Sequence, residues 1–198
     1  MTAEPSIDRF YLHRFLEEHR SDITGDVLEI QVPGYTRQFG IDVRTSHTVD
    51  IVSEFSPTFQ CDLANADGHI PSVAYDCFLL PNTLQHLKHI DGALRQAFRV
   101  LKPGGVILAS AAGLLRLTSA SDDYWRLSPA GWRELTAGAW PNAEIAISAH
   151  GNCLSAAAAI YGLAVEELDT RELVVQDERF PVLITIRCQK PAAPQDAT

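Results

Sequence analysis

Apolar residues recur with two different periods along this chain, and the two periods alternate. Between residues 7 and 20 they fall at the three- and four-residue spacing of an amphipathic helix, with Ser6 as its cap. Short apolar runs typical of buried strands occur at 26–32, 75–80 and 106–110. This alternation predicts an α/β fold in which helices cover both faces of a mostly parallel sheet.

Weaker patterns complete the predicted sheet. A second strand is expected between Asp42 and Val52, and a short third strand ends near Cys61 and Asp62. Two late strands at 144–149 and 182–187 are expected to add an antiparallel edge, which gives seven strands in all. Further helices are expected at 35–39, after a cap at Asp91, after Ser128 with Pro129 in the first turn, and at 153–168 after a cap at Asn152.

A Pro-Gly-Gly turn connects one of these helices to the strand at 106–110. Pro103 cannot continue a helix, and Gly104 and Gly105 permit the left-handed backbone of a tight turn. The helix that begins near Asp91 is therefore expected to end at about Leu101. Helix end, turn and buried strand form one predicted unit.

The length of 198 residues suits one domain, predicted over residues 1–190. The segment 191–198 is polar and rich in Pro and Ala, so we expect it to be disordered. No apolar run approaches the roughly 20 residues of a membrane span, and no secretion signal is visible. We therefore expect a cytoplasmic protein with no membrane partner.

Charge and cysteine spacing narrow the classes of partner. Lys and Arg number 16 against 25 Asp and Glu, and the resulting net charge of -9 argues against a nucleic-acid partner. The 4 cysteines lack a short paired spacing, which favours free thiols in a reducing compartment. His86 and His89 lie three positions apart but have no third ligand at a matching spacing, so no metal site is predicted.

Four segments, in this order and spacing, resemble the class I S-adenosylmethionine-dependent methyltransferases of the small single-domain type. They are Val27-Leu28-Glu29-Ile30 with the turn after it, Cys61-Asp62-Leu63, Tyr75-Asp76-Cys77-Phe78-Leu79-Leu80, and Arg99-Val100-Leu101-Lys102-Pro103-Gly104-Gly105. The resemblance covers about residues 22–188 and implies a Rossmann-like fold. It also implies that S-adenosylmethionine is the cofactor and binds at the carboxyl ends of the strands. The runs at 35–40 and 123–126 are similar to a subgroup associated with sugar or natural-product modification.

The resemblance assigns the first loop to the methionine part of the cofactor. Glu29 holds the acidic position of the first strand, either close to the ligand or as a carboxylate that holds the loop together. Gln31, Pro33 and Tyr35 stand where the family has glycines, and Gly34 alone remains. Glycine lets backbone and ligand approach closely, so Gln31 is expected to crowd this position.

The resemblance also assigns the ribose and adenine positions. A carboxylate normally accepts hydrogen bonds from both ribose hydroxyls, and His47 falls at that position, with Asp50 and Glu54 as alternatives. Asp62 and Leu63 match the adenine position, where one accepts from the amino group and the other covers the ring. Asp62 is alternatively only the cap of the following turn.

Pro81 and Asn82 follow the fourth strand and are expected to contact the cofactor. His86 comes next and is the candidate catalytic base, because a histidine pKa lies near neutrality. Its alternative interpretation is an exposed histidine on a helix face.

Tyr124, Trp125 and Arg126 lie where the family often closes over its substrate. The rings can stack on a flat or sugar-like ligand, and the guanidinium can pair with an anion. A surface loop pinned by Trp125 is the alternative.

Three functional hypotheses follow. The first is a methyltransferase acting on the hydroxyl of a small secondary metabolite or sugar, with S-adenosylmethionine as donor. The second keeps the fold but loses methyl transfer and acts as a cyclase or rearrangement catalyst, as the replacements Gln31, Pro33 and His47 suggest. The third is a non-catalytic subunit that binds a homologous partner or forms a homodimer.

Overall fold

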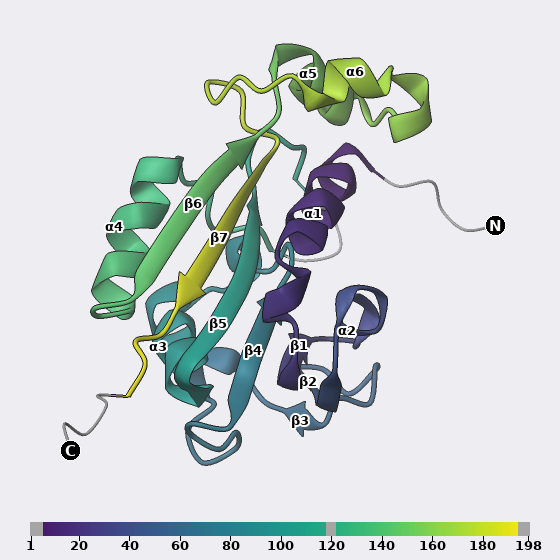
Figure 1. Ribbon diagram of the computed structural model, residues 1–198. Coiled ribbons are helices and arrows are strands. Elements are labelled where there is room, and N and C mark those ends of the chain that lie inside the picture. Colours follow the sequence, from purple (N-terminus) through teal and green to yellow (C-terminus); the bar gives the residue numbers. More distant parts are fainter. Residues whose placement is uncertain (1–5, 118–121, 194–198) are drawn as a thin grey trace.

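The computed structural model describes residues 6–117 and 122–193 (Figure 1). Seven strands form one sheet in the order β3-β2-β1-β4-β5-β7-β6. The strands are β1 (Gly25–Ile30), β2 (Val43–Asp50), β3 (Phe59–Gln60), β4 (Tyr75–Leu80), β5 (Leu101–Ala112), β6 (Glu144–His150) and β7 (Leu183–Gln189). The helices are α1 (Ile7–Glu18), α2 (Gly34–Phe39), α3 (Ile90–Val100), α4 (Pro129–Ala139), α5 (Cys153–Tyr161) and α6 (Thr170–Val174). Short 3₁₀ turns occupy Arg20–Asp22, Leu63–Asn65, Leu84–His86 and Val165–Glu167.

The directions of the strands confirm the predicted sheet. The neighbouring strands from β3 to β5 pair in parallel, and β7 pairs antiparallel with both β5 and β6. Since β6 and β5 are both antiparallel to β7, their carboxyl ends lie at the same edge of the sheet. This carboxyl edge is where open α/β sheets bind ligands.

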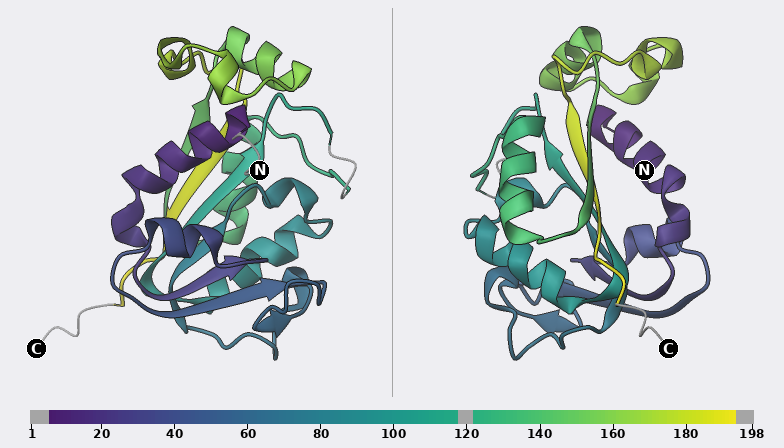
Figure 2. Two further views of the ribbon diagram at one scale, coloured as in Figure 1. Left: turned by 90° about the vertical axis from the view of Figure 1, so that its right-hand side faces the viewer. Right: turned by 60° about the vertical axis from the view of Figure 1, so that its left-hand side comes forward.

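Helices cover both faces of the sheet, as the alternation predicted (Figure 2). The α1 and α2 helices lie on one face, and α3 and α4 lie on the other. Successive strand residues point to opposite faces, so Cys77 and Leu79 of β4 pack in the core with α1, whereas Phe78 and Leu80 pack in the core with α3. The α5 and α6 helices belong to an insertion between β6 and β7, beyond the carboxyl edge (Figure 1).

Of the four predicted helix caps, two are confirmed and one is wrong. The fourth, Ser6, takes the cap position of α1 but makes no capping hydrogen bond with its side chain. The side chains of Ser128 and Asn152 accept hydrogen bonds from the first turns of α4 and α5. Asp91 does not cap α3, which begins one residue earlier and has His89 at the cap position. The Asp91 carboxylate lies inside the first turn and pairs with Arg95, one turn further along the helix.

Two predicted boundaries change by several residues. The helix expected over 153–168 ends at Tyr161, because Gly162 adopts a left-handed φ of 80° and caps it. The strand expected from Val106 begins at Leu101, since the Pro-Gly-Gly turn, with Gly104 at a φ of 81°, is accommodated as an irregularity inside β5. Of the tail predicted to be disordered, 194–198 lie outside the described residues.

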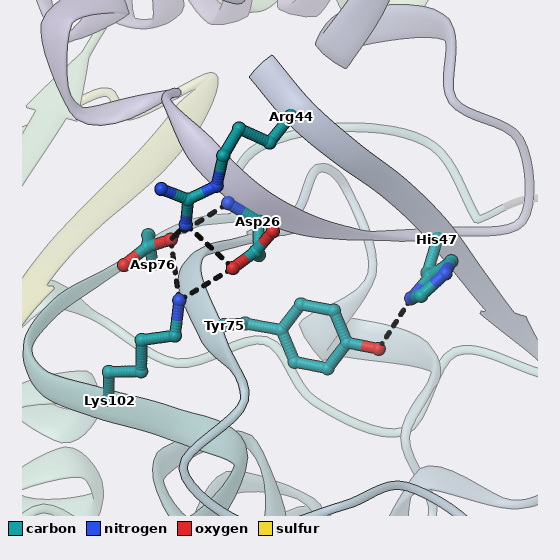
Figure 3. Close-up of polar contacts among 6 residues, drawn as sticks. All are labelled: Asp26, Arg44, His47, Tyr75, Asp76 and Lys102. Carbon is teal, nitrogen blue, oxygen red and sulfur yellow. Dashed lines mark hydrogen bonds and ion pairs between the residues drawn. The ribbon is translucent and has the colours of Figure 1, made fainter. Parts of the chain in front are cut away.

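Four charged residues join the amino ends of β1, β2, β4 and β5, at the edge opposite the ligand side (Figure 3). Asp26 Oδ2 accepts from Arg44 Nη2 at 2.8 Å and from Lys102 Nζ at 2.7 Å. Asp76 Oδ2 accepts from the same two groups at 3.1 and 2.8 Å. We call these residues the amino-edge cluster. Because Lys102 directly precedes Pro103, the cluster anchors the Pro-Gly-Gly turn to three other strands.

We expect Lys102→Met to lower the free energy of unfolding by ~1 kcal/mol at pH 7, as for other partly exposed ion pairs. Arg44 and then Lys102 hold the pKa of Asp26 well below its usual range. This stabilisation is complete above the unfolded pKa of an aspartate and is lost as the pH falls toward the lowered folded value. Urea unfolding at pH 7 and pH 3 measures the effect, and a difference between the two proteins that does not narrow at pH 3 would contradict it.

Candidate functional site

A cavity of about 660 Å³ opens at the carboxyl edge, a volume typical of small-molecule sites. The ends of β1, β2 and β4 and the segments after β3 and β4 form its walls. Among the predicted site residues, seven line this cavity: Gln31, Asp62, Leu63, Pro81, Asn82, His86 and Tyr124. The other five lie outside its walls: Glu29, Gly34, His47, Trp125 and Arg126.

The first loop keeps the backbone of a glycine turn without a glycine. Gln31 has a φ of 66°, in the left-handed region that side chains rarely adopt. Its N–H donates to Val49 O at 2.9 Å, which ties the turn to β2. The exposed side chain of Gln31 stands at the cavity wall, as expected from its position after the first strand.

Glu29 forms its hydrogen bonds with α2 and does not line the cavity. It is 1% exposed, and its carboxylate accepts from the N–H of Tyr35 at 2.9 Å and from the N–H and hydroxyl of Thr36 at 2.8 and 2.6 Å. Burial raises the pKa of Glu29, and the hydrogen bonds from α2 oppose that rise. Of the two interpretations of Glu29, the geometry favours the carboxylate that holds the loop together. Gly34 begins α2 behind this loop.

His47 lies in the middle of β2, and the strand ends three residues later, at Asp50. The His47 ring contacts the hydroxyl of Tyr75 at 2.9 Å (Figure 3). It also packs edge-on against Phe59. Burial raises the pKa of Tyr75 to about 12. Of the two acidic alternatives that the sequence offered, Asp50 lines the cavity and Glu54 does not. Asp50 Oδ1 accepts from Val52 N at 3.1 Å, and its other oxygen has no partner among the described residues.

Asp62 has two roles at once. Its Oδ1 accepts from Ala64 N at 2.9 Å and its Oδ2 from Asn65 Nδ2 at 3.2 Å, so it caps the turn that follows, and it also lines the cavity. Leu63 beside it is buried and adds an apolar surface to the same wall. The two interpretations of Asp62 are therefore compatible.

Asn82 connects the cavity to the first helix. It has a left-handed φ of 48°, and its N–H donates to Ser110 Oγ of β5 at 2.7 Å. Its side-chain amide donates to Asp8 Oδ2 of α1 at 2.8 Å. The residue before it, Pro81, also lines the cavity. The loop after β4 is thus fixed from two sides.

The hydrogen bonds around His86 define its tautomer. The amide of Gln85 is oriented because its Oε1 accepts from Ala112 N and its Nε2 donates to Asn82 O. His86 Nδ1 lies 2.8 Å from the carbonyl oxygen of Asp122, and Nε2 lies 3.1 Å from Gln85 Nε2. A carbonyl only accepts and an amide nitrogen only donates, so the neutral ring carries its proton on Nδ1 and presents a basic Nε2.

Only one of the three predicted substrate-binding residues in the 122–128 segment lines the cavity. Tyr124 does, and its hydroxyl donates to Asp122 Oδ2 at 2.7 Å. Trp125 donates from Nε1 to Leu87 O at 2.8 Å, which favours the alternative of a loop pinned by this ring. Arg126 pairs with Asp123 and donates to Gly113 O at 2.8 Å. The segment is held against the body by its own hydrogen bonds.

Sequence analysis missed several cavity residues. Ile51, which is 65% exposed, and Cys61 stand beside the acidic side chains of the β2 and β3 ends, and Lys88 stands beyond His86. For Ile51 and Cys61, a position at or near the end of a predicted strand was the available signal, whereas Lys88 lies eight residues after the fourth strand. In residues 6–117 and 122–193, no group of three or more His, Cys, Asp or Glu side chains is arranged to hold a metal. The helices in these ranges are also too short or too polar to cross a membrane.

Comparison with known proteins agrees with this architecture. A family model described as "Methyltransferase domain" matches residues 34–109. The ubiquinone/menaquinone biosynthesis C-methyltransferase UbiE of Bartonella tribocorum is 47% identical over 47 residues, which make up 23% of this chain and 18% of that protein. The match thus spans less than a fifth of the curated relative.

Solved structures extend the likeness to nearly the whole chain. An S-adenosylmethionine-dependent methyltransferase from Mesorhizobium loti has a TM-score of 0.60 at 11% identity, over 93% of this chain and 98% of that chain. The [4+2]-cyclase SpnF has a TM-score of 0.56 at 16% identity, over 94% of this chain and 82% of that chain. These structures confirm the Rossmann-like class I methyltransferase fold.

Proposed function

We propose that this chain, which has the fold of the class I S-adenosylmethionine-dependent methyltransferases, is a methyltransferase acting on the hydroxyl of a small molecule. The observation that carries the proposal is the cavity at the carboxyl edge, into which β2 delivers the carboxylate of Asp50. A match of the methyltransferase domain model to residues 34–109 supports the same activity.

The residues present fit the cofactor. The half-paired carboxylate of Asp50 provides acceptors for ribose hydroxyls, as the strand-two position requires. Asp62 and the buried Leu63 provide the polar and apolar surfaces for adenine. Gln31 adopts a left-handed φ of 66°, which glycine favours, so the turn toward the proposed methionine position forms without a glycine here.

S-adenosylmethionine supplies an electrophilic methyl group on a good leaving group, so the protein mainly has to align the acceptor. In this proposal, the loop after β4 contributes Asn82, fixed by Ser110 and Asp8. His86 receives the hydroxyl proton on Nε2, while its Nδ1–H stays on the carbonyl of Asp122. To do so, Nε2 exchanges its contact with Gln85 for the acceptor hydroxyl.

Calorimetric titration with S-adenosylmethionine and S-adenosylhomocysteine tests the proposal. We expect both to bind, with Kd values in the micromolar range. Methyl transfer is then sought with a labelled donor and a panel of small hydroxylated acceptors. Failure of both ligands to bind at millimolar concentration would reject the methyltransferase function.

We expect Gln31→Gly to tighten S-adenosylhomocysteine binding several-fold. Glycine removes the side chain from the cavity wall and adopts a φ of 66° without the ~1 kcal/mol cost of a left-handed L-residue. Gln31→Ala is the matched control, because it removes most of the side chain but keeps the backbone strain. Calorimetry measures affinity and urea unfolding measures stability. Equal binding by Gln31→Gly would contradict crowding by the Gln31 side chain, and weaker binding would show that this side chain contacts the ligand.

A cyclase or rearrangement catalyst is the second candidate. The side chain of Gln31 at the cavity wall favours it, because methyl transfer does not require that bulk, and the cyclase SpnF shares the fold. Conversion of an acceptor at an unchanged rate after removal of S-adenosylmethionine would support this candidate over methyl transfer.

A further inference from the structure

A second, smaller groove of about 240 Å³ lies between the start of α1 and the end of α5. Ser6, Ile7 and Asp8 form one side, Ala159, Gly162 and Leu163 form the other, and Leu115 and Arg116 after β5 complete it. An antiparallel bridge between Ser6 and Ala164 holds the two sides together. The groove therefore has a built frame from three segments that are far apart in the sequence.

The groove adjoins the main cavity through one hydrogen bond. Asp8 lines the groove, and its Oδ2 accepts from the side-chain amide of Asn82, which lines the cavity, at 2.8 Å. A ligand in the groove thus lies one residue pair away from the candidate site of methyl transfer. The carboxylate of Asp8 is therefore already hydrogen-bonded within the protein.

Arg116 is the cation of this groove. It is exposed, and its guanidinium has no hydrogen bond or ion pair with any described residue. A Cβ built at Gly162 would lie 3.9 Å from Arg116 Nη1, so the side chain reaches across to the end of α5. The guanidinium of Arg126, by contrast, forms an ion pair with the carboxylate of Asp123. In a chain with a net charge of -9, an arginine that has no partner among the described residues favours an anion beside the site.

The remaining surface is apolar. Leu115 and Ala159 pack on the core below the groove, and Leu163 is 36% exposed above it. An apolar body next to a single cationic group is the pattern of a site for an amphipathic acid.

We propose that this groove binds the body of the acceptor substrate, an elongated apolar small molecule that carries a carboxylate. The carboxylate pairs with Arg116, the apolar body lies along Leu115 and Leu163, and the reacting end passes Asp8 and Asn82 into the cavity. The role of this molecule as methyl acceptor rests on the proposed methyltransferase function. The affinity of the groove for an apolar carboxylate does not depend on that function.

Binding of octanoate, 1-octanol and octylamine to the full chain saturated with S-adenosylhomocysteine tests the proposal by calorimetry. We expect octanoate to bind about tenfold more tightly than either of the other two, the effect of one charge-assisted pair. Arg116→Gln should abolish this preference and leave 1-octanol binding unchanged, while Leu163→Ser should weaken both ligands. Arg133→Gln on the exposed face of α4 carries the same charge change and serves as the matched control.

Two results would overturn the proposal. One is equal binding of octanoate to the wild-type chain and the Arg116→Gln variant. The other is loss of octanoate binding in Lys88→Gln instead, which would place the anion at the rim of the main cavity. Titration of S-adenosylhomocysteine alone separates the two proposals, because its failure to bind rejects the methyltransferase function and leaves the octanoate preference to be judged separately.

Discussion

Asp50→Ala is expected to weaken S-adenosylhomocysteine binding about 100-fold. Asp50 ends β2 at the cavity, and one of its oxygens has no partner among the described residues. Two charge-assisted hydrogen bonds from ribose hydroxyls to this carboxylate would together contribute ~2.7 kcal/mol, which corresponds to that change in Kd. Calorimetric titration of the variant and the wild-type chain gives the ratio directly.

Two control variants test whether the position of the carboxylate matters. Glu54→Ala removes an exposed acidic residue from the loop after β2, and His47→Ala removes the residue that the family resemblance placed at the ribose. Neither residue lines the cavity, so both variants should bind within about twofold of the wild-type chain. Asp50→Asn retains an acceptor for Val52 N and should still lose most of the affinity. A larger loss in His47→Ala than in Asp50→Ala would contradict the assignment.

Glu29→Ala is expected to lower the free energy of unfolding by about 3 kcal/mol, because it leaves three donors of Tyr35 and Thr36 without their acceptor. Two of these donors are N–H groups in the first turn of α2, so the loop and the short helix should loosen together. Urea unfolding measures the free energy, and protection of the α2 amides from hydrogen exchange reports the local effect.

Glu29→Gln separates the loss of the acceptor from the loss of charge. Because burial raises the pKa of Glu29, the folded state favours its protonated form. Wild-type stability should therefore fall as the pH rises from the ordinary glutamate pKa through the raised value, and Glu29→Gln should lack this part of the pH dependence. We expect Glu29→Gln to be less damaging than Glu29→Ala at pH 7. Equal stability of Glu29→Ala and the wild-type chain would disprove the structural role.

These two acidic residues show how a divergent first loop can retain a ligand cavity. Glu29 holds the loop from inside, through α2, and does not depend on glycines in the loop. Gln31 then supplies the left-handed turn at some cost in strain. Asp50 reaches the cavity from the neighbouring strand, whose register with β1 is fixed by parallel pairing. The recognition surface is thus distributed over strand ends, and the loop composition affects only one part of it.

The segment between β6 and β7 carries α5 and α6. Leu173 of α6 is fully buried, and its carbonyl oxygen accepts from the Tyr11 hydroxyl at 2.9 Å, so the insertion is anchored to α1. Asn152 donates from its side chain to the carbonyl oxygens of Glu172 and Val175, which closes the insertion on itself. A rigid insertion beside the carboxyl edge can select a substrate by shape, which agrees with a groove at its base.

Sequence alone determined the order of elements and the class of fold. The apolar run at Tyr75–Leu80 coincides with β4, and the caps at Ser128 and Asn152 are where the local pattern placed them, because propensity and hydrogen bonding to neighbouring residues decide such features. The end of α3 next to Leu101 likewise matches the local pattern, whereas the Pro-Gly-Gly turn that follows it lies inside β5. These features depend on residues close together in the chain.

Only the tertiary structure decided which side chains reach the cavity. His47 and Asp50 lie three positions apart in one strand, and the point where β2 stops pairing with β1 determines which of them faces the ligand side. Glu29 turned inward because α2 folds back over it and offers three donors. The contact of Asp8 with Asn82 and that of Arg116 with the end of α5 arise from packing between segments far apart in the sequence. Local sequence patterns do not predict such contacts.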